Sequence, residues 1–201
     1  MKTLILVRHA HSLSNERDVV SCTPPGEGLS ARGRDQALAL GKRLASEYVG
    51  VAAASELVRT QETLELALGN RGVSRLVLPE LNEIHFGRFD AGPLEAYRQW
   101  AWALPADEVC PGGGESRGDA ACRVADALEL LSARTEDVVL AVGHALPIRY
   151  VLDAADGRSP TPRIEPVLHA EPYVLPVDRV VAASEALRRW AVAPLFGDAQ
   201  A

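Results

Sequence analysis

Short apolar runs separated by longer amphipathic segments constrain the fold of this chain most strongly. Residues 3–7 and 138–142 are continuous apolar stretches of the kind found in strands that are buried on both faces. Shorter runs at residues 51–54, 76–78 and 173–175 have the same strand-like character. Because strands that alternate with helices form mostly parallel sheets, the pattern predicts an α/β fold with helices on both faces of the sheet.

The segments between these runs show helical spacing. In residues 29–48, Ala37, Leu40 and Leu44 fall on one face, and Ser30 is placed to cap the helix start. Further helices are predicted at residues 57–68, 94–104, 116–134, 146–152 and 183–189. The sequence therefore predicts one three-layer α/β/α domain over residues 1–201, in which residues 89–114 form a small cap insertion over one edge.

Charge and cysteine content exclude several classes of protein. The net charge of −6 argues against a nucleic-acid partner, which requires a basic face. Three cysteines without C-x-x-C spacing favour neither a disulfide framework nor a zinc site, and suit a reducing cytoplasm. The N-terminal apolar run is too short for a signal-peptide core, and no run approaches a membrane-spanning length. We expect a cytoplasmic protein without membrane or nucleic-acid partners, and the oligomeric state stays open.

Polar residues follow the predicted strands at the points where they end. Arg8 and His9 directly follow the first run, and His144 directly follows the fourth. Ligands of open α/β sheets bind beyond the carboxyl ends of the strands, so neighbouring strands would bring the two histidines together. Arg59 and Glu83 follow the second and third strands toward the same edge.

This combination of side chains suits a phosphate monoester. Arginine presents a planar fork of donors that matches phosphate oxygens. A histidine among arginines favours its neutral form, because nearby positive charge opposes protonation, and neutral imidazole is a competent nucleophile. A carboxyl group can protonate the leaving oxygen and later activate water.

Six blocks of the sequence, in order, resemble the histidine phosphatase superfamily, the phosphoglycerate-mutase-like proteins. They are LVRHAHSLSN at residues 6–15, LSARGRDQA at 29–37, SELVRTQET at 55–63, LNEIHFG at 81–87, GGGES at 112–116, and VGH with a following IR at 142–149. The resemblance implies His9 as the nucleophile and Glu83 as the proton donor. It further implies that phosphate is bound by Arg8, Asn15, Arg59 and His144, with no metal ligand and no cofactor.

The chain departs from the family pattern at two places. Ala10 stands where the family usually has glycine after the nucleophile, and alanine tolerates a positive φ less readily. The segment between Gly87 and Gly112 is shorter than the insertion usual in mutases. The resemblance therefore implies a phosphatase-type member that hydrolyses a small phosphorylated metabolite through a phosphohistidine.

Three other functions remain open. A phosphoglycerate-type mutase would use the same phosphohistidine, and a non-catalytic phosphate-binding module would keep the pocket alone. The H-x-H spacing of His9 and His11 also occurs in metallohydrolases, although the chain is short for a (β/α)₈ barrel.

The sequence gives no catalytic role to three further histidines, which are His11, His85 and His169. Trp100 and Trp102 are interpreted as helix packing, with an apolar wall for the substrate as the alternative.

Overall fold

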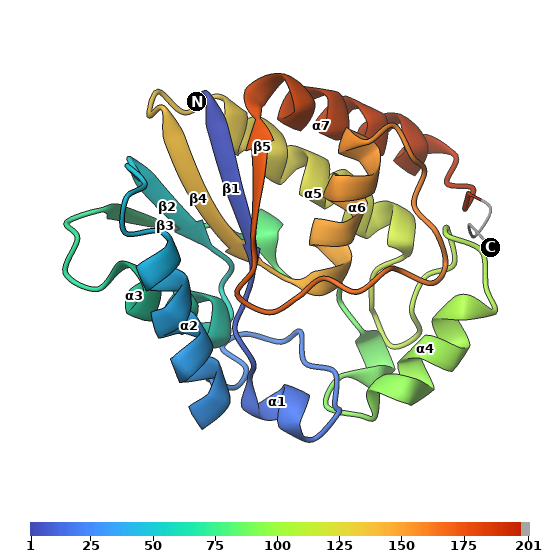
Figure 1. Cartoon of the computed structure of the whole chain (residues 1–201). Helices are drawn as coiled ribbons and strands as arrows, with labels where there is room; N and C mark the ends of the chain where they lie inside the picture. The colour runs from blue at the N-terminus through green and yellow to red at the C-terminus, as the bar shows by residue number, and fades with distance from the viewer. Residues whose placement is uncertain (198–201) are drawn as a thin grey trace.

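A five-stranded sheet in the order β3-β2-β4-β1-β5 forms the centre of the computed structural model, which describes residues 1–197 (Figure 1). Strands β1 to β4 run parallel, and β5 is antiparallel to β1. The predicted fold class is confirmed, while the end of the predicted domain, 198–201, lies outside the described residues. The strands are β1 Thr3–Arg8, β2 Val51–Ala54, β3 Ser74–Val77, β4 Val138–Gly143 and β5 Pro172–Pro176.

The two longest apolar runs are neighbours in the sheet. In the parallel pair β1 and β4, Leu6 lies opposite Ala141 and Arg8 opposite Gly143. The pairing continues past the strand ends, because the backbone N–H of His9 donates to the Gly143 carbonyl at 2.9 Å. The register therefore brings the residue after each strand, His9 and His144, to the same edge, as the sequence predicts.

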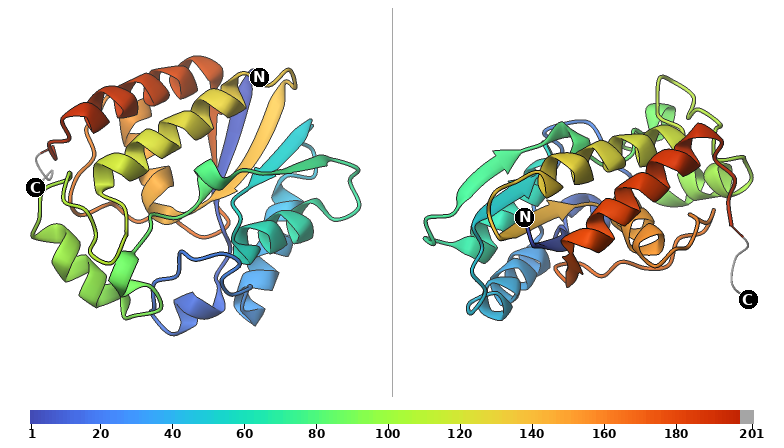
Figure 2. Two further views of the ribbon diagram at one scale, coloured as in Figure 1. Left: turned by 180° about the vertical axis from the view of Figure 1, so that it is seen from behind. Right: turned by 90° about the horizontal axis from the view of Figure 1, so that it is seen from above.

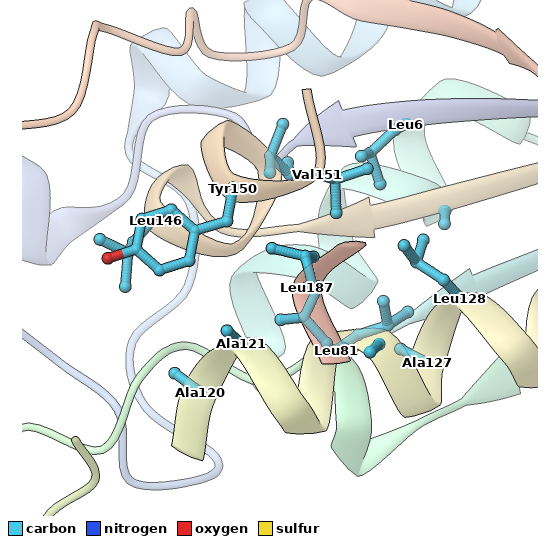
Figure 3. Close-up of a cluster of buried hydrophobic side chains, with 14 of the residues drawn as sticks. Leu6, Leu81, Ala120, Ala121, Ala127, Leu128, Leu146, Tyr150, Val151 and Leu187 are labelled. Atoms are coloured by element: carbon cyan, nitrogen blue, oxygen red, sulfur yellow. The ribbon is translucent and has the colours of Figure 1, made fainter. Parts of the chain in front are cut away.

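Helices cover both faces of the sheet, as Figure 2 shows in two further views. On one face, Ile5 and Val7 pack in a cluster with residues of α2 and α3. On the other face, Leu6 packs with residues of α5, α6 and α7, among them Leu128 and Leu187 (Figure 3). The helices are α1 Leu13–Glu16, α2 Ala31–Arg43, α3 Val58–Leu68, α4 Leu94–Trp102, α5 Arg117–Ser132, α6 Ala145–Ala155 and α7 Val177–Val192, and the 3₁₀ turns are η1 Pro79–Leu81 and η2 Gly87–Phe89.

Several predicted bounds need correction. Ser30 caps α2 as expected, since its hydroxyl accepts from the Gly33 N–H, but the helix ends at Arg43 instead of continuing to residue 48. The last helix is more than twice as long as predicted, because Val180, Ala183 and Leu187 give it a buried stripe along its length. The helix α1 was missed, being a single turn with no apolar periodicity.

Strand β3 begins two residues before the predicted run at 76–78 and ends at Val77. It is an edge strand with exposed side chains at three of its four positions, so no long apolar run marks its start. Across residues 1–197, no helix is both long and apolar enough to cross a membrane.

The segment from η2 to α5 folds back on the main domain through a tight glycine contact. Gly87 has φ of +51°, and a Cβ atom there would lie 2.2 Å from the carbonyl oxygen of Pro111. A side chain is therefore excluded at this position. Beyond it, Tyr97 of α4 is buried against Phe86, with ring centroids 4.6 Å apart. These contacts hold α4 in place beside the carboxyl edge of the sheet.

Candidate active site

A cavity of about 260 Å³ opens beyond the carboxyl ends of β1 and β4. Five of the six predicted site residues line it: Arg8, His9, Asn15, Arg59 and Glu83. The sixth, His144, is fully buried and does not form part of the cavity wall, although its ring centroid is 5.2 Å from that of His9. The structure thus brings all six together but places His144 behind the others.

Hydrogen bonds define the tautomer of His9. Its Nδ1 lies 2.8 Å from the carbonyl oxygen of Ala10, which can only accept, so Nδ1 carries the proton. Its Nε2 lies 3.2 Å from Nε of Arg59, which can only donate. Burial, followed by the positive charge of Arg59, holds the pKa of His9 well below its usual range. His9 is therefore neutral, with the lone pair of Nε2 directed to the Arg59 side of the cavity.

Arg59 connects the two histidines. Its Nη2 donates to the Ser21 carbonyl at 2.8 Å and lies 3.3 Å from Nδ1 of His144. Its buried Nη1 has no hydrogen-bond partner within residues 1–197. An arginine donor left without a partner in a buried site is available for an anionic ligand.

Hydrogen bonds also fix the tautomer of His144. Because Nδ1 faces an Arg59 donor, the ring proton is on Nε2, which donates to Oγ of Ser55 at 2.9 Å. Burial, and then the charge of Arg59, hold the pKa of His144 well below its usual range. Ser55 itself follows β2 directly and orients the ring of His144.

Arg8 and Asn15 each have part of their hydrogen-bonding capacity already used. Nη1 of Arg8 donates to the Val167 carbonyl at 2.8 Å, while its buried Nε has no partner in the described structure. Burial lowers the pKa of Arg8 to about 10, so the side chain still carries its charge at neutral pH. Oδ1 of Asn15 accepts from the backbone N–H of Ser12 at 3.1 Å and from its hydroxyl at 2.9 Å. Capping of α1 therefore uses the Asn15 oxygen and leaves its NH₂ group to donate.

Glu83 is the only carboxylate in the cavity wall formed by residues 1–197. Its Oε1 accepts from the backbone N–H of Ile84 at 3.0 Å. Burial raises the pKa of Glu83 against the opposing effects of that hydrogen bond and of Arg59 and Arg8. A carboxyl group with a raised pKa stays protonated to higher pH, which suits it to donate a proton.

His169 is the residue near the site that the sequence analysis missed. Its Nδ1 lies 2.8 Å from the backbone carbonyl of His9, to which it donates, and the two ring centroids are 5.5 Å apart. Burial lowers the pKa of His169 to about 4, so the ring is neutral. No local pattern marks this residue, because it lies in the loop before β5 and 160 positions from His9.

His11 does not form a metal site with His9. Its Nδ1 lies 3.0 Å from the hydroxyl of Ser30, and its side chain is absent from the cavity wall. Among residues 1–197, no three His, Cys, Asp or Glu side chains converge as metal ligands would. The metallohydrolase hypothesis therefore has no ligand set in the described chain.

Several apolar and aromatic side chains also line the cavity. Leu94, Tyr97 and Trp102 of α4 form one wall, and Ile164 of the loop after α6 also contributes. Trp102 lines the cavity, in agreement with the alternative interpretation as an apolar wall, whereas Trp100 packs on Phe89, with ring centroids 5.5 Å apart.

Comparison with known families identifies the superfamily of the chain. The family model described as histidine phosphatase superfamily (branch 1) matches residues 4–170. The chain belongs to the histidine phosphatase superfamily. The matched region includes every residue of the candidate site, from Arg8 to His169.

Relatives within this superfamily include phosphatases. The adenosylcobalamin/alpha-ribazole phosphatase of Escherichia coli is 32% identical over 118 residues, which are 56% of this chain and 58% of that enzyme. The PE-PGRS family protein PE_PGRS11 of Mycobacterium tuberculosis is 37% identical over 107 residues, or 49% of this chain and 18% of that protein. The match thus spans less than two thirds of either relative.

The fold is also shared with solved structures. The alpha-ribazole phosphatase from Shigella flexneri superposes with a TM-score of 0.69 at 28% identity, covering 78% of this chain and 80% of that one. Membership of the superfamily therefore rests on both sequence and fold.

Proposed function

We propose that this protein is a metal-independent phosphomonoesterase that hydrolyses a small phosphorylated metabolite through a phosphohistidine on His9. The observation that carries the proposal is the protonation pattern of His9. The Ala10 carbonyl holds the ring proton on Nδ1 and leaves Nε2 with its lone pair at the cavity. A neutral imidazole with a fixed tautomer is the form that attacks phosphorus.

In the first step, Nε2 of His9 attacks the phosphorus atom in line with the leaving oxygen. The P–O bond breaks, and protonated Glu83 delivers its proton to that oxygen, so the product leaves as an alcohol. The raised pKa of Glu83 and its place in the cavity wall support this role. Arg8, Arg59 and the NH₂ group of Asn15 line the same cavity and would bind the equatorial oxygens.

In the second step, ionised Glu83 removes a proton from water, which attacks the phosphohistidine and releases phosphate. Glu83 and His9 thereby return to their starting states. His144 would assist from behind the wall. Phosphate would draw Arg59 away from Nδ1 of His144, and the negative charge of the phosphate would let this nitrogen take up a proton from solvent and donate to the phosphate.

Features beyond the reacting groups complete the proposal. The phosphatases among the relatives support hydrolysis as the overall reaction. Residues 89–114 would act as a small cap, because α4 supplies part of the cavity wall. The free thiols of Cys22, Cys110 and Cys122 suit a reducing compartment, so we place the protein in the cytoplasm.

The test is hydrolysis of p-nitrophenyl phosphate in excess EDTA by the native protein and by His9→Ala. We expect chelator-resistant turnover that falls by at least about 10⁴-fold in the variant. Denaturation at alkaline pH after mixing with a labelled substrate should trap an acid-labile, alkali-stable phosphoenzyme in the native protein alone. Equal turnover in both proteins would refute the assignment of His9.

A mutase gives a different result in the same assay. It would form the phosphoenzyme, require a bisphosphorylated primer, and return label to an organic acceptor instead of to water. A binding module would show phosphate-dependent thermal stabilisation without any phosphoenzyme.

A further inference from the structure

Arg117 is a buried cation that the proposed chemistry does not use. It is the first residue of α5, is 6% exposed, and lines the same cavity as His9. Its Nη1 donates to the hydroxyl of Tyr150 at 2.9 Å, and its buried Nε has no partner within residues 1–197. No carboxylate of the described chain pairs with it. Burial of a charged group without a counter-ion is unfavourable, so a ligand that supplies the counter-ion would be bound strongly.

The net charge of the cavity wall also favours a ligand with an additional negative charge. The wall contains four arginines and one carboxyl group, which gives a net charge of at least plus three while His9 is neutral. The arginines are Arg8, Arg59, Arg98 and Arg117. A phosphate monoester at neutral pH carries about two negative charges, because its second pKa is about 6. At least one positive charge therefore remains in a protein whose overall charge is −6.

Arg117 lies beside a second polar group of the cavity wall. It is next to Tyr97, with its guanidinium carbon 5.9 Å from the centre of the ring. The Tyr97 hydroxyl is also buried without a partner in the described structure. Burial raises the pKa of Tyr97 to about 12, so its hydroxyl stays protonated at neutral pH and can donate to an anion. Tyr97, Arg117 and Glu83 all line the one cavity, so a leaving group that takes its proton from Glu83 would share this cavity with Tyr97 and Arg117.

We propose that Arg117 and the Tyr97 hydroxyl bind a second anionic group, a carboxylate or a second phosphate, on the leaving group of the substrate. This inference rests on the proposed phosphatase activity and adds the class of substrate. The body of the leaving group lies against Leu94, Trp102 and Ile164, so an aromatic or other compact apolar spacer between the two anions fits the wall.

Two matched esters test this proposal. In 4-carboxyphenyl phosphate the second group is anionic, and in 4-carbamoylphenyl phosphate it has the same shape without charge. We expect kcat/KM of the native protein to favour the carboxylate by at least about tenfold, and Arg117→Met to reduce this ratio to near one. The ratio of two substrates on one preparation does not depend on how much of the variant is folded. Arg117→Lys, which keeps the charge, should retain part of the preference.

Arg88→Met is the matched control, because Arg88 is exposed and does not line the cavity, and its ratio should equal the native one. A further ester, 1,4-phenylene bisphosphate, has a second phosphate in place of the carboxylate. The ratio of its kcat/KM to that of the carbamoyl ester shows whether the site binds a phosphate as well as a carboxylate. A native ratio near one for both anionic esters would overturn the proposal. An unchanged ratio in Arg117→Met would overturn it as well.

Measurements of binding test the second anion site independently of the proposed activity. Dissociation constants for the same esters are measured by titration calorimetry in a His9→Ala background, where no turnover is needed. Tighter binding of an anionic ester that disappears in His9→Ala/Arg117→Met supports the second anion site even if the native protein proves inactive. Equal affinities for all esters would refute the site even if the protein proves to be a phosphatase.

Discussion

Nε of Arg59 donates to Nε2 of His9 at 3.2 Å, so the residue proposed to bind phosphate also occupies the lone pair proposed to attack it. Attack on phosphorus requires this hydrogen bond to break. An incoming phosphate oxygen would accept from Arg59 instead and release Nε2 in the same event. Substrate binding and activation of the nucleophile are thereby coupled through one guanidinium group.

This relationship predicts that Arg59→Lys reduces kcat by about 10²–10³-fold, because an ammonium group lacks the fork that reaches both His9 and phosphate. Steady-state kinetics with p-nitrophenyl phosphate measure the effect. Arg75→Lys, an exposed change on β3, is the control and should leave kcat unaltered. If kcat of Arg59→Lys is within tenfold of the native kcat, a positive charge alone suffices at this position.

The raised pKa of Glu83 predicts the pH dependence of the reaction. The protonated form donates to the leaving oxygen, and burial keeps that form populated to higher pH than usual. For phenyl phosphate, a poor leaving group, kcat/KM should therefore stay level below the raised pKa and decline above it. Glu83→Gln should abolish the decline and lower the rate by about 10²–10⁴-fold. The loss should be smaller for 2,4-dinitrophenyl phosphate, and equal losses for both esters would contradict the role of Glu83 as proton donor.

His169 is predicted to act through the backbone of the nucleophile. Its Nδ1–H holds the His9 carbonyl at 2.8 Å, and removal of this donor should let His9 shift in the cavity. We expect His169→Leu to lower kcat by about 10–10²-fold with little change in KM, because small misplacements of a nucleophile slow chemistry sharply. His169→Asn keeps an N–H donor near the position of Nδ1 and should restore most of the rate. Similar kcat values for the two variants would show that the hydrogen bond has no positioning effect.

The backbone conformation at Ala10, which follows the proposed nucleophile, does not require glycine. The φ angle of Ala10 is not positive, so an alanine adopts this backbone conformation without strain. Its methyl group is fully buried among the core residues of the α2 and α3 face. Ala10→Gly should therefore leave kcat within about threefold while lowering the free energy of unfolding by about 1 kcal/mol. Urea denaturation measures the second quantity. A large gain in activity would mean that alanine does distort the cavity.

The amino-acid sequence alone determined the α/β fold class, the family and the identity of the residues at the sheet edge. The apolar runs that become β1 and β4 end directly in Arg8-His9 and Gly143-His144, and a strand backbone leaves the next residue little freedom of position. These are local properties, because burial and periodicity are written in consecutive residues. The strands with long apolar runs were accordingly predicted better than the exposed edge strand β3.

The tertiary structure alone decided the arrangement behind and around that edge. His169 reaches the His9 carbonyl from a loop 160 residues away, and Arg117 reaches the cavity from the start of α5. It also placed His144 behind the wall and assigned the tautomers of both histidines. Such contacts depend on strand order and on the paths of loops. These are set by the packing of the whole domain, and no pattern among neighbouring residues encodes them.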